Sequence, residues 1–362
     1  MINSYGDYMI VGVIKAFWSN KGVTQPQVSP TALHFTRGNF ERSFLFFFFT
    51  AVPEVFSGDF VYLYGDIINS IMQTLKNDVL TVEVSEHGAE LQSIRKGTTE
   101  YLWQGDPAYW GRRSPVLFPI VGSVWEKRYR VNGTEYELGQ HGFARDMKFV
   151  LVSQTEDEVR YRLESDEETL KKYPYPFVLE IAYRLHGSSL DVIWEVTNPA
   201  SEEMYFQIGA HPAFNYPDYD PQTTERGYFV FDKSEGLQCI RIVEKGCVDA
   251  ETRYPLEIPA DGRLKVERDT FDAIDTIMLQ DSQIGRVDYL RADGTPWLSL
   301  TFDAPVVGIW SPPGKVAPFI CIEPWYGRCD RAGYEGEYQD KDWMNRLAPG
   351  EKFSSVYTIE IL

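Results

Sequence analysis

Short alternating runs separated by turn residues are the feature that most constrains the fold of this chain. From Leu80 onward apolar and polar residues alternate, as in LTVEVSEHGAELQSI and in the carboxyl-terminal SSVYTIEIL. A period of two places the apolar side chains on one face of a strand, so these runs predict half-buried β-strands. The pair Asn132–Gly133 within YRVNGTEYEL is the strongest short-range signal for a β-hairpin.

Helical patterning is scarce by comparison. Two further hairpins are predicted around Gly187–Ser188 and Asp293–Gly294, whereas only SDEETLKKY and QDKDWMNRL could each form two helical turns. Many short strands with few helices predict an all-β chain that folds as one large antiparallel β-sandwich. We predict a single domain over residues 72–362, because no repeat, linker or low-complexity tract interrupts it.

The first 71 residues differ from the rest. They carry few charges and no alternating pattern, and they contain the apolar run FLFFFFTAV at residues 44–52. That run is shorter than the roughly 20 residues needed to span a bilayer, and it lies too far from Met1 for an ordinary signal peptide. Our hypothesis is that Met72 is the native start and that residues 1–71 are an extension outside the fold. A membrane-tethering role for the extension is the alternative. We expect a chain that begins at Met72 to fold and to keep its activity.

Charge and cysteine content limit the partners. The chain has 35 Lys and Arg against 53 Asp and Glu, a formal net charge of −18. Such acidity argues against nucleic acid and anionic membranes as partners, because phosphate binding needs clustered cations. The four cysteines form no C-x-x-C pair, which favours reduced thiols in a cytoplasmic protein over a disulfide framework or a four-thiolate zinc site.

Polar and aromatic segments interrupt the strands at four places. In RRSPVLFPIVG the adjacent Arg112 and Arg113 must face either solvent or a polar ligand, because a buried arginine without partners is costly. In QHGFARD, Gln140 and His141 precede Arg145. A lone histidine in such a segment is more often structural than catalytic, and the remaining segments decide between the two.

The other two segments contain the sharpest candidates. In GAHPAFNYP, His211 precedes a proline that must break the strand, so the alternative is a histidine in a turn. In ICIEPWYGR, Glu323 ends an apolar strand beside Trp325 and Tyr326. Burying a carboxylate there costs free energy unless the group is paired or takes part in chemistry. Burial should also raise its pKa toward the range useful for proton transfer.

Several other chemistries lack their motifs. The sequence has no phosphate-binding P-loop, no G-x-G-x-x-G turn, no G-x-S-x-G nucleophile elbow and no H-E-x-x-H. Two histidines and one glutamate could form a metal triad. They lie in separate segments, however, and no feature demands a metal, so we expect neither a metal nor a cofactor.

The four segments together resemble the aldose 1-epimerase (galactose mutarotase) family, in particular a shorter, divergent branch. They occur in the family's order and at about its spacing, and the resemblance covers residues 72–362. It implies a galactose mutarotase-like supersandwich whose open face binds a monosaccharide. It also implies interconversion of α and β anomers without a cofactor.

The resemblance implies a role for each candidate residue. Glu323 matches the catalytic base, His211 the general acid and His141 a second histidine that binds and polarises the sugar. The substrate-binding positions that it implies are Arg112, Arg113, Arg145, Asp275 and Gln140, with Asp272 as an alternative to Asp275. Trp325 and Tyr326 could stack on the sugar, although core packing explains them equally well.

The chemistry agrees with these residue types. Ring opening of a hemiacetal needs a base at the anomeric hydroxyl and an acid at the ring oxygen, and a buried glutamate with a histidine near its ordinary pKa would suit. We therefore predict an isomerase, an aldose 1-epimerase acting on a hexose or a hexose 6-phosphate, as a monomer or homodimer in the cytoplasm. The alternatives are a non-catalytic carbohydrate-binding or sensing protein and an epimerase acting at another carbon.

Overall fold

The computed structural model describes residues 72–362, and the predictions made for residues 1–71 lie outside this range. The described chain is all-β, as predicted, with strands that pair antiparallel and one short α-helix, α4 (Glu167–Lys172). Three 3-10 turns complete the helical structure: η2 (Trp125–Lys127), η3 (Ala144–Asp146) and η4 (Tyr338–Asp340).

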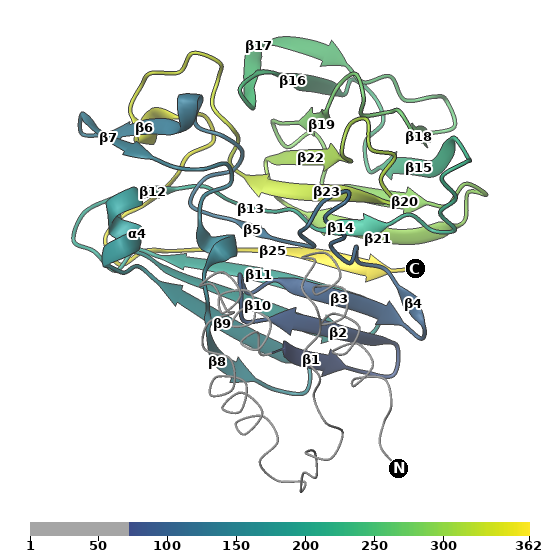
Figure 1. Ribbon diagram of the computed structural model, residues 1–362, viewed down its shortest axis with the longest axis horizontal. Helices are drawn as coiled ribbons and strands as arrows, with labels where there is room; N and C mark the ends of the chain where they lie inside the picture. Colours follow the sequence, from purple (N-terminus) through teal and green to yellow (C-terminus); the bar gives the residue numbers. More distant parts are fainter. Residues whose placement is uncertain (1–71) are drawn as a thin grey trace, which may run out of the picture. The chain divides into compact units, whose positions relative to one another are not determined.

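Two large sheets dominate the described chain (Figure 1). One has nine strands, in the order β18 (Leu264–Glu267), β15 (Glu225–Phe231), β20 (Arg286–Leu290), β21 (Pro296–Phe302), β25 (Lys352–Ile361), β11 (Ser189–Thr197), β10 (Val178–His186), β9 (Glu158–Glu164) and β8 (Val150–Gln154). The other has eight: β17 (Cys247–Pro255), β16 (Gln238–Glu244), β19 (Thr276–Leu279), β22 (Val306–Trp310), β23 (Phe319–Tyr326), β13 (Ile208–Ala210) and β5 (Val116–Leu117), with β14 (Ala213–Asn215) also paired to β23.

Three smaller sheets complete the fold. They are the four-stranded sheet of β1 (Met72–Lys76), β2 (Leu80–Ser85), β3 (Leu91–Lys96) and β4 (Thr99–Glu100), the hairpin of β6 (Arg128–Val131) and β7 (Thr134–Glu137), and the pair of β12 (Met204–Phe206) and β24 (Asn345–Leu347). The hairpin confirms the Asn132–Gly133 prediction, because both turn residues have positive φ, 50° and 74°.

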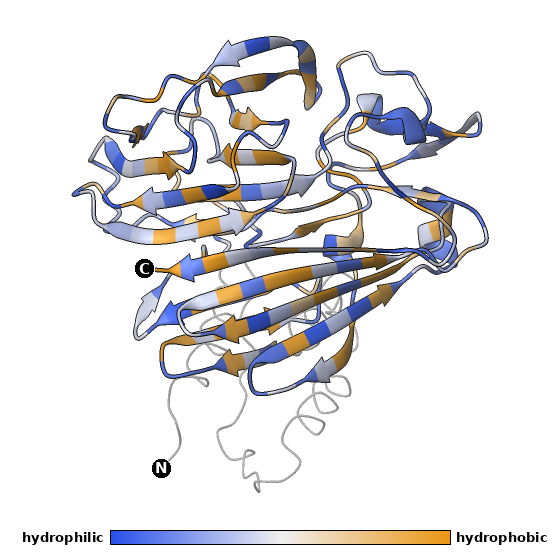
Figure 2. Ribbon diagram, turned by 180° about the vertical axis from the view of Figure 1, so that it is seen from behind, coloured by the Kyte–Doolittle hydropathy of each residue, from blue (hydrophilic) through white to orange (hydrophobic). Residues whose placement is uncertain are grey.

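The main core is shared by the two large sheets and the four-stranded sheet. Along β11 buried and half-buried residues alternate, which places Val192 and Trp194 in this core. Ile320 and Ile322 of β23 enter the same core from the eight-stranded sheet. Figure 2 shows the alternation as bands of orange and blue along the strands. The period-two pattern therefore reports real burial on one face of each sheet.

One of the two predicted helical segments is wrong. SDEETLKKY does form α4, whose amino end is capped by Asp166, but QDKDWMNRL forms no α-helix. Its first residues belong to η4, and its last three form β24 and pair with β12. Between them the Lys341 ammonium is buried against the Asp330 carboxylate. These long-range contacts override a weak local helical preference.

Candidate active site

The two faces of β23 have different roles. Ile320 and Ile322 point into the main core, so the alternation places Cys321, Glu323 and Trp325 on the opposite face. Glu323 is 1% exposed and lies opposite Gly308 of β22. A side chain at Gly308 would collide with the Trp325 ring, at 2.4 Å. The missing side chain at Gly308 therefore leaves the space that Trp325 fills beside Glu323.

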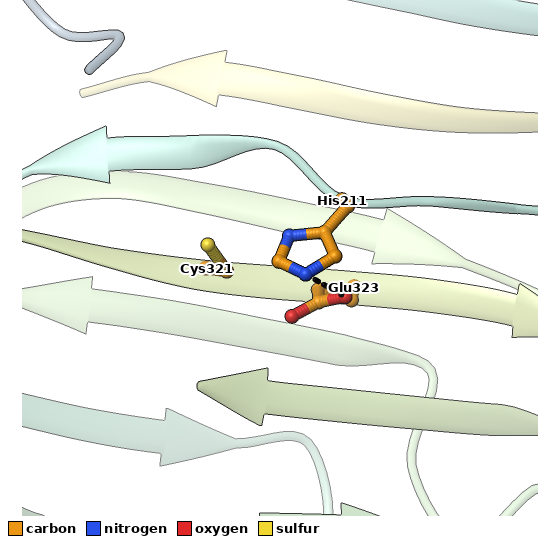
Figure 3. A group of neighbouring side chains, drawn as sticks. All are labelled: His211, Cys321 and Glu323. Atoms are coloured by element: carbon orange, nitrogen blue, oxygen red, sulfur yellow. Dashed lines mark ion pairs between the residues drawn. The ribbon is translucent and has the colours of Figure 1, made fainter. Parts of the chain in front are cut away.

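His211 lies in a break between two strands. β13 and β14 both pair with β23, and the two residues between them are His211 and Pro212. Since proline has no N–H to donate, the ladder is interrupted there. The His211 ring reaches β23, and its Nε2 lies 3.3 Å from Oε2 of Glu323 (Figure 3). The proposed acid and base, predicted from segments more than 100 residues apart, are therefore in contact.

This pair is in close contact but is not locked by hydrogen bonds. Neither Oε2 of Glu323 nor Nδ1 of His211 has a hydrogen-bond partner within the described part of the chain, although both atoms are buried. The 3.3 Å separation is short enough for an ion pair. Its geometry does not meet the angles of a hydrogen bond. Unpaired polar atoms on two buried titratable groups are costly in a purely structural site, and they are typical of groups that await a ligand.

Burial shifts both pKa values toward the neutral forms. It raises the pKa of Glu323 well above its usual range, and the negative charge of Asp275 raises it further. Burial lowers the pKa of His211 to about 3, with further lowering by the positive charges of Arg145 and Arg112. The expectation of a histidine near its ordinary pKa is therefore wrong for this site. At 3.3 Å each charge would stabilise the other, but desolvation of two buried charges outweighs that attraction.

His141 is held in one orientation and one tautomer. Its backbone N–H donates to the Gly122 carbonyl at 2.8 Å, and the Gly122 N–H donates to His141 Nδ1 at 3.1 Å. Because Nδ1 accepts, the proton of the neutral imidazole lies on Nε2. Its ring lies edge-on to that of His211, with centroids 5.6 Å apart. Burial keeps the pKa of His141 well below its usual value, so it presents a neutral N–H donor.

The predicted arginines separate into two groups. Arg145 and Arg112 both act on the charge states of His141 and His211. Arg145 donates to the Gln140 carbonyl at 2.7 Å, and its buried Nε has no hydrogen-bond partner among residues 72–362. Arg112 pairs with Asp146 at 2.8 Å.

Two other predicted positions are placed differently. Arg113 turns toward β3, where its guanidinium donates to the Gln92 carbonyl at 2.9 Å. The Gln140 side chain is exposed, and its backbone carbonyl rather than its amide contacts Arg145. The structure therefore brings Arg112 and Arg145 together with the two histidines, whereas the Arg113 guanidinium is bound to β3.

The two candidate aspartates also separate. Asp275 is half-buried, raises the pKa of Glu323, and has a positive φ of 59°, which is uncommon for a residue other than glycine. Asp272 is exposed and accepts the Gly314 N–H at 2.8 Å. Asp275 is therefore the aspartate associated with Glu323, and Asp272 supports a neighbouring loop.

Aromatic residues that the sequence did not single out surround His211. Trp110 stacks on its ring at 4.7 Å, and Trp310 meets it edge-on at 5.5 Å. Both are half-buried, so part of each ring is open to a ligand. Trp310 could have been found from the sequence, because it lies two residues after Gly308 on the same face of β22. Trp110 gives no such signal, since it lies outside any strand.

The aromatic pair that follows Glu323 belongs to the core instead. Trp325 is buried between the glycines of β13 and β22, and its indole N–H donates to the Ala210 carbonyl at 3.1 Å. The Tyr326 hydroxyl bonds with Asp303 and Ser355. Core packing therefore accounts for both residues.

Comparison with known proteins identifies the family. A sequence model described as aldose 1-epimerase matches residues 72–360. The chain belongs to the aldose 1-epimerase family. Protein LacX of Lactococcus lactis subsp. lactis is 33% identical over 299 residues, which cover 80% of this chain and 98% of that protein.

Solved structures of aldose 1-epimerase relatives share this fold. A galactose mutarotase related enzyme from Lactobacillus acidophilus is 33% identical with a TM-score of 0.73, covering 81% of this chain and 97% of its own. A galactose mutarotase-like protein from Lactobacillus casei is 31% identical with a TM-score of 0.74, covering 81% and 100%. The predicted galactose mutarotase-like fold is therefore confirmed. Among residues 72–362 of this epimerase family member, no helix is long and apolar enough to cross a bilayer.

Proposed function

We propose that this protein is an aldose 1-epimerase (mutarotase) that interconverts the α and β anomers of a hexose. The observation that carries the proposal is the buried contact between Glu323 and His211, whose Oε2 and Nε2 atoms lie 3.3 Å apart. The ring of His141 lies edge-on to the ring of His211, and the ring of Trp110 stacks on it. Ring opening requires a base and an acid, and a neutral N–H donor and an aromatic face suit the binding of a sugar.

The proposed reaction moves two protons and makes no covalent intermediate with the enzyme. Glu323 takes the proton of the anomeric hydroxyl while His211 gives a proton to the ring oxygen, and the bond between the anomeric carbon and the ring oxygen breaks. The open-chain aldehyde then rotates about the bond to its neighbouring carbon. Ring closure on the other face returns both protons, so the enzyme ends the cycle as it began. The Nε2 proton of His141 stabilises oxygen charge through a hydrogen bond.

The electrostatics of the pair favour this exchange. Before ring opening Glu323 must be ionised and His211 protonated, and after it both are neutral; the total number of protons on the pair and the sugar is unchanged. Burial favours the neutral forms of both groups. Once the ion pair has formed beside the closed ring, ring opening therefore removes two buried charges, which favours the open-chain state. Arg145 and Arg112 strengthen His211 as an acid by lowering its pKa.

The pH dependence of turnover tests this proton count. The pair is active while it holds one exchangeable proton, and it gains a second only as pH falls toward the lowered pKa of His211, about 3. It loses the first only as pH rises through the raised pKa of Glu323. We expect the acid limb of kcat/KM to lie near the lowered pKa of His211, about 3, and the alkaline limb to follow the raised pKa of Glu323. An acid limb near the ordinary pKa of glutamate, about 4.3, would contradict a shifted pair.

His141→Asn tests the second histidine. Asparagine tolerates the positive φ of 65° at this position and can still accept the Gly122 N–H, so the fold should survive. We expect kcat/KM to fall about 10- to 100-fold, the effect of losing a hydrogen bond to developing charge, with little change in Tm. The matched control is His186→Asn, an exposed histidine at the end of β10, which should keep the wild-type rate. A sharp drop in Tm with an intact rate for His141→Asn would make His141 a structural residue.

A hexose 6-phosphate is the second candidate substrate, and the two arginines beside the histidines favour it. Arg112 and the half-buried Arg145 place positive charge at the site of a strongly acidic chain. If the substrate carries phosphate, Arg112→Ala should raise KM for the phosphosugar about 10- to 100-fold more than for the free sugar, since a charge-assisted hydrogen bond is worth about 1.5–3 kcal/mol. Arg113→Ala is the matched control, because its guanidinium is bound to the Gln92 carbonyl. Equal effects of Arg112→Ala on both sugars would favour a neutral hexose.

The principal rival is a carbohydrate-binding or sensing protein on the same scaffold. Such a protein needs aromatic rings and hydrogen-bond donors, but it has no use for a buried carboxyl group that touches a buried imidazole. The cost of burying an unpaired Oε2 on Glu323 and an unpaired Nδ1 on His211, with no partner among residues 72–362, therefore favours the enzyme.

A further inference from the structure

We propose that the candidate active site also binds a thiophilic divalent cation, such as Zn²⁺ or Co²⁺, through His211, Cys321 and Glu323, and that the bound cation blocks the site. Within residues 72–362 these three form the one group of potential metal ligands that converge. One ligand atom from each lies within 4.8 Å of the other two, and all three residues are buried. His141, which the sequence allowed as part of a metal triad, is not in this group.

The strand geometry brings the thiol to the pair. Cys321 and Glu323 are separated by two positions on β23, so their side chains leave the same face, and His211 reaches over both from the break between β13 and β14 (Figure 3). Nδ1 of His211 and Oε2 of Glu323 carry no hydrogen bond from residues 72–362. A cation that binds here displaces no hydrogen bond between the imidazole and the carboxyl group.

The spacing is close to that of a tetrahedral zinc site with three protein ligands. Zinc lies about 2.3 Å from sulfur and about 2.0–2.2 Å from nitrogen and oxygen, which separates tetrahedral ligands by about 3.4–3.6 Å. The 3.3 Å between Nε2 and Oε2 matches this separation already. The longest separation in the group is at most 4.8 Å, so binding would have to close it by about 1 Å. A thiolate beside an imidazole and a carboxylate selects a borderline or soft cation over Mg²⁺ or Ca²⁺.

Binding would stop proton transfer. The cation takes the carboxylate oxygen and the imidazole nitrogen that face each other, which are the atoms that exchange protons with the sugar. The thiol of Cys321 and the carboxyl group of Glu323 each bind as the anion, and the released protons go to solvent. The cation is thus an inhibitor and not a cofactor, so a chelator should leave the metal-free rate unchanged. The inhibition part of this inference rests on the proposed function, whereas the binding part does not.

Cobalt is the probe that separates the two parts. A Co²⁺–thiolate bond gives a ligand-to-metal charge-transfer absorption that oxygen and nitrogen ligands do not give, and all four cysteines of the chain lie in the described part. We expect the full-length protein, stripped with chelator and titrated with Co²⁺, to develop this band with one equivalent. Cys321→Ser should abolish the band and weaken Co²⁺ binding, measured by calorimetry, by more than about 100-fold, since even outer-shell partners of a metal are worth about 10- to 100-fold.

Matched variants control for binding at another thiol and for unfolding. Cys247→Ser removes another buried thiol, in β17, and should keep both the band and the affinity. Cys321→Ala and His211→Asn give independent losses of binding should the serine variant unfold. A band that survives in Cys321→Ser and Cys321→Ala, or no band in the wild-type protein, overturns the inference. If Co²⁺ binds through Cys321 but the protein shows no mutarotase activity, the metal site stands and the proposed function fails.

Discussion

Glu323→Gln should lower kcat by about 10²- to 10⁴-fold, the usual cost of removing a general base. Glutamine keeps the volume of the side chain on β23 but cannot accept the anomeric proton. The measurement is the rate of anomer interconversion by polarimetry, with circular dichroism as the control for folding. A variant that keeps more than a tenth of the wild-type rate would show that Glu323 is not the base.

Glu323→Gln should also stabilise the protein at high pH, where the Glu323 carboxyl group of the wild type is ionised. The raised pKa of Glu323 means that its contribution to the free energy of unfolding is fully present below its unfolded pKa and is lost as pH rises through its folded pKa. Glutamine has no proton to lose. We therefore expect the Tm of Glu323→Gln to exceed that of wild type at high pH, and the difference to shrink as pH falls. A gain in stability with a loss of activity distinguishes a residue kept for chemistry from one kept for structure.

His211→Asn should produce a loss of similar size, about 10²- to 10⁴-fold in kcat. Asparagine leaves the break at Pro212 in place but has no group that can protonate a ring oxygen. The double variant with Glu323→Gln should be about as slow as the slower single variant, because the two groups exchange protons with one sugar and act as a unit. Multiplicative losses in the double variant would mean that the two residues act in separate steps.

The sequence predicted the fold from its alternation and turn residues, since both report local geometry. The prediction from sequence failed where long-range contacts determine the local structure. Residues 345–347 form the strand β24 because β12 lies beside them. The pair of Glu323 and His211 was predicted from residue type and from the family resemblance, but the 3.3 Å contact between them depends on β13 and β14 both pairing with β23. Nothing local in the sequence specifies that arrangement.

The arginines show a different limit. Arg112 and Arg113 are neighbours in the sequence, and residue type alone cannot separate them. The structure separates them through partners that lie elsewhere, because the Gln92 carbonyl of β3 holds Arg113 while Asp146 pairs with Arg112. The lowered pKa of His211 was missed for a similar reason, since it depends on burial and on charges supplied by two other segments. Trp110 was missed because a tryptophan in a loop has no periodic signature.

The most direct test of the proposed mutarotase is polarimetry on fresh sugar in chelator-containing buffer. Purified full-length protein is added to newly dissolved α-glucose, α-galactose or their 6-phosphates, and the approach to the anomeric equilibrium is compared with the spontaneous rate. We predict that at least one of these sugars equilibrates faster in proportion to enzyme concentration, and that Glu323→Gln abolishes the acceleration. An approach at the spontaneous rate for all four sugars, with protein shown to be folded, would contradict the assignment of Glu323 and His211 to anomer interconversion of these hexoses.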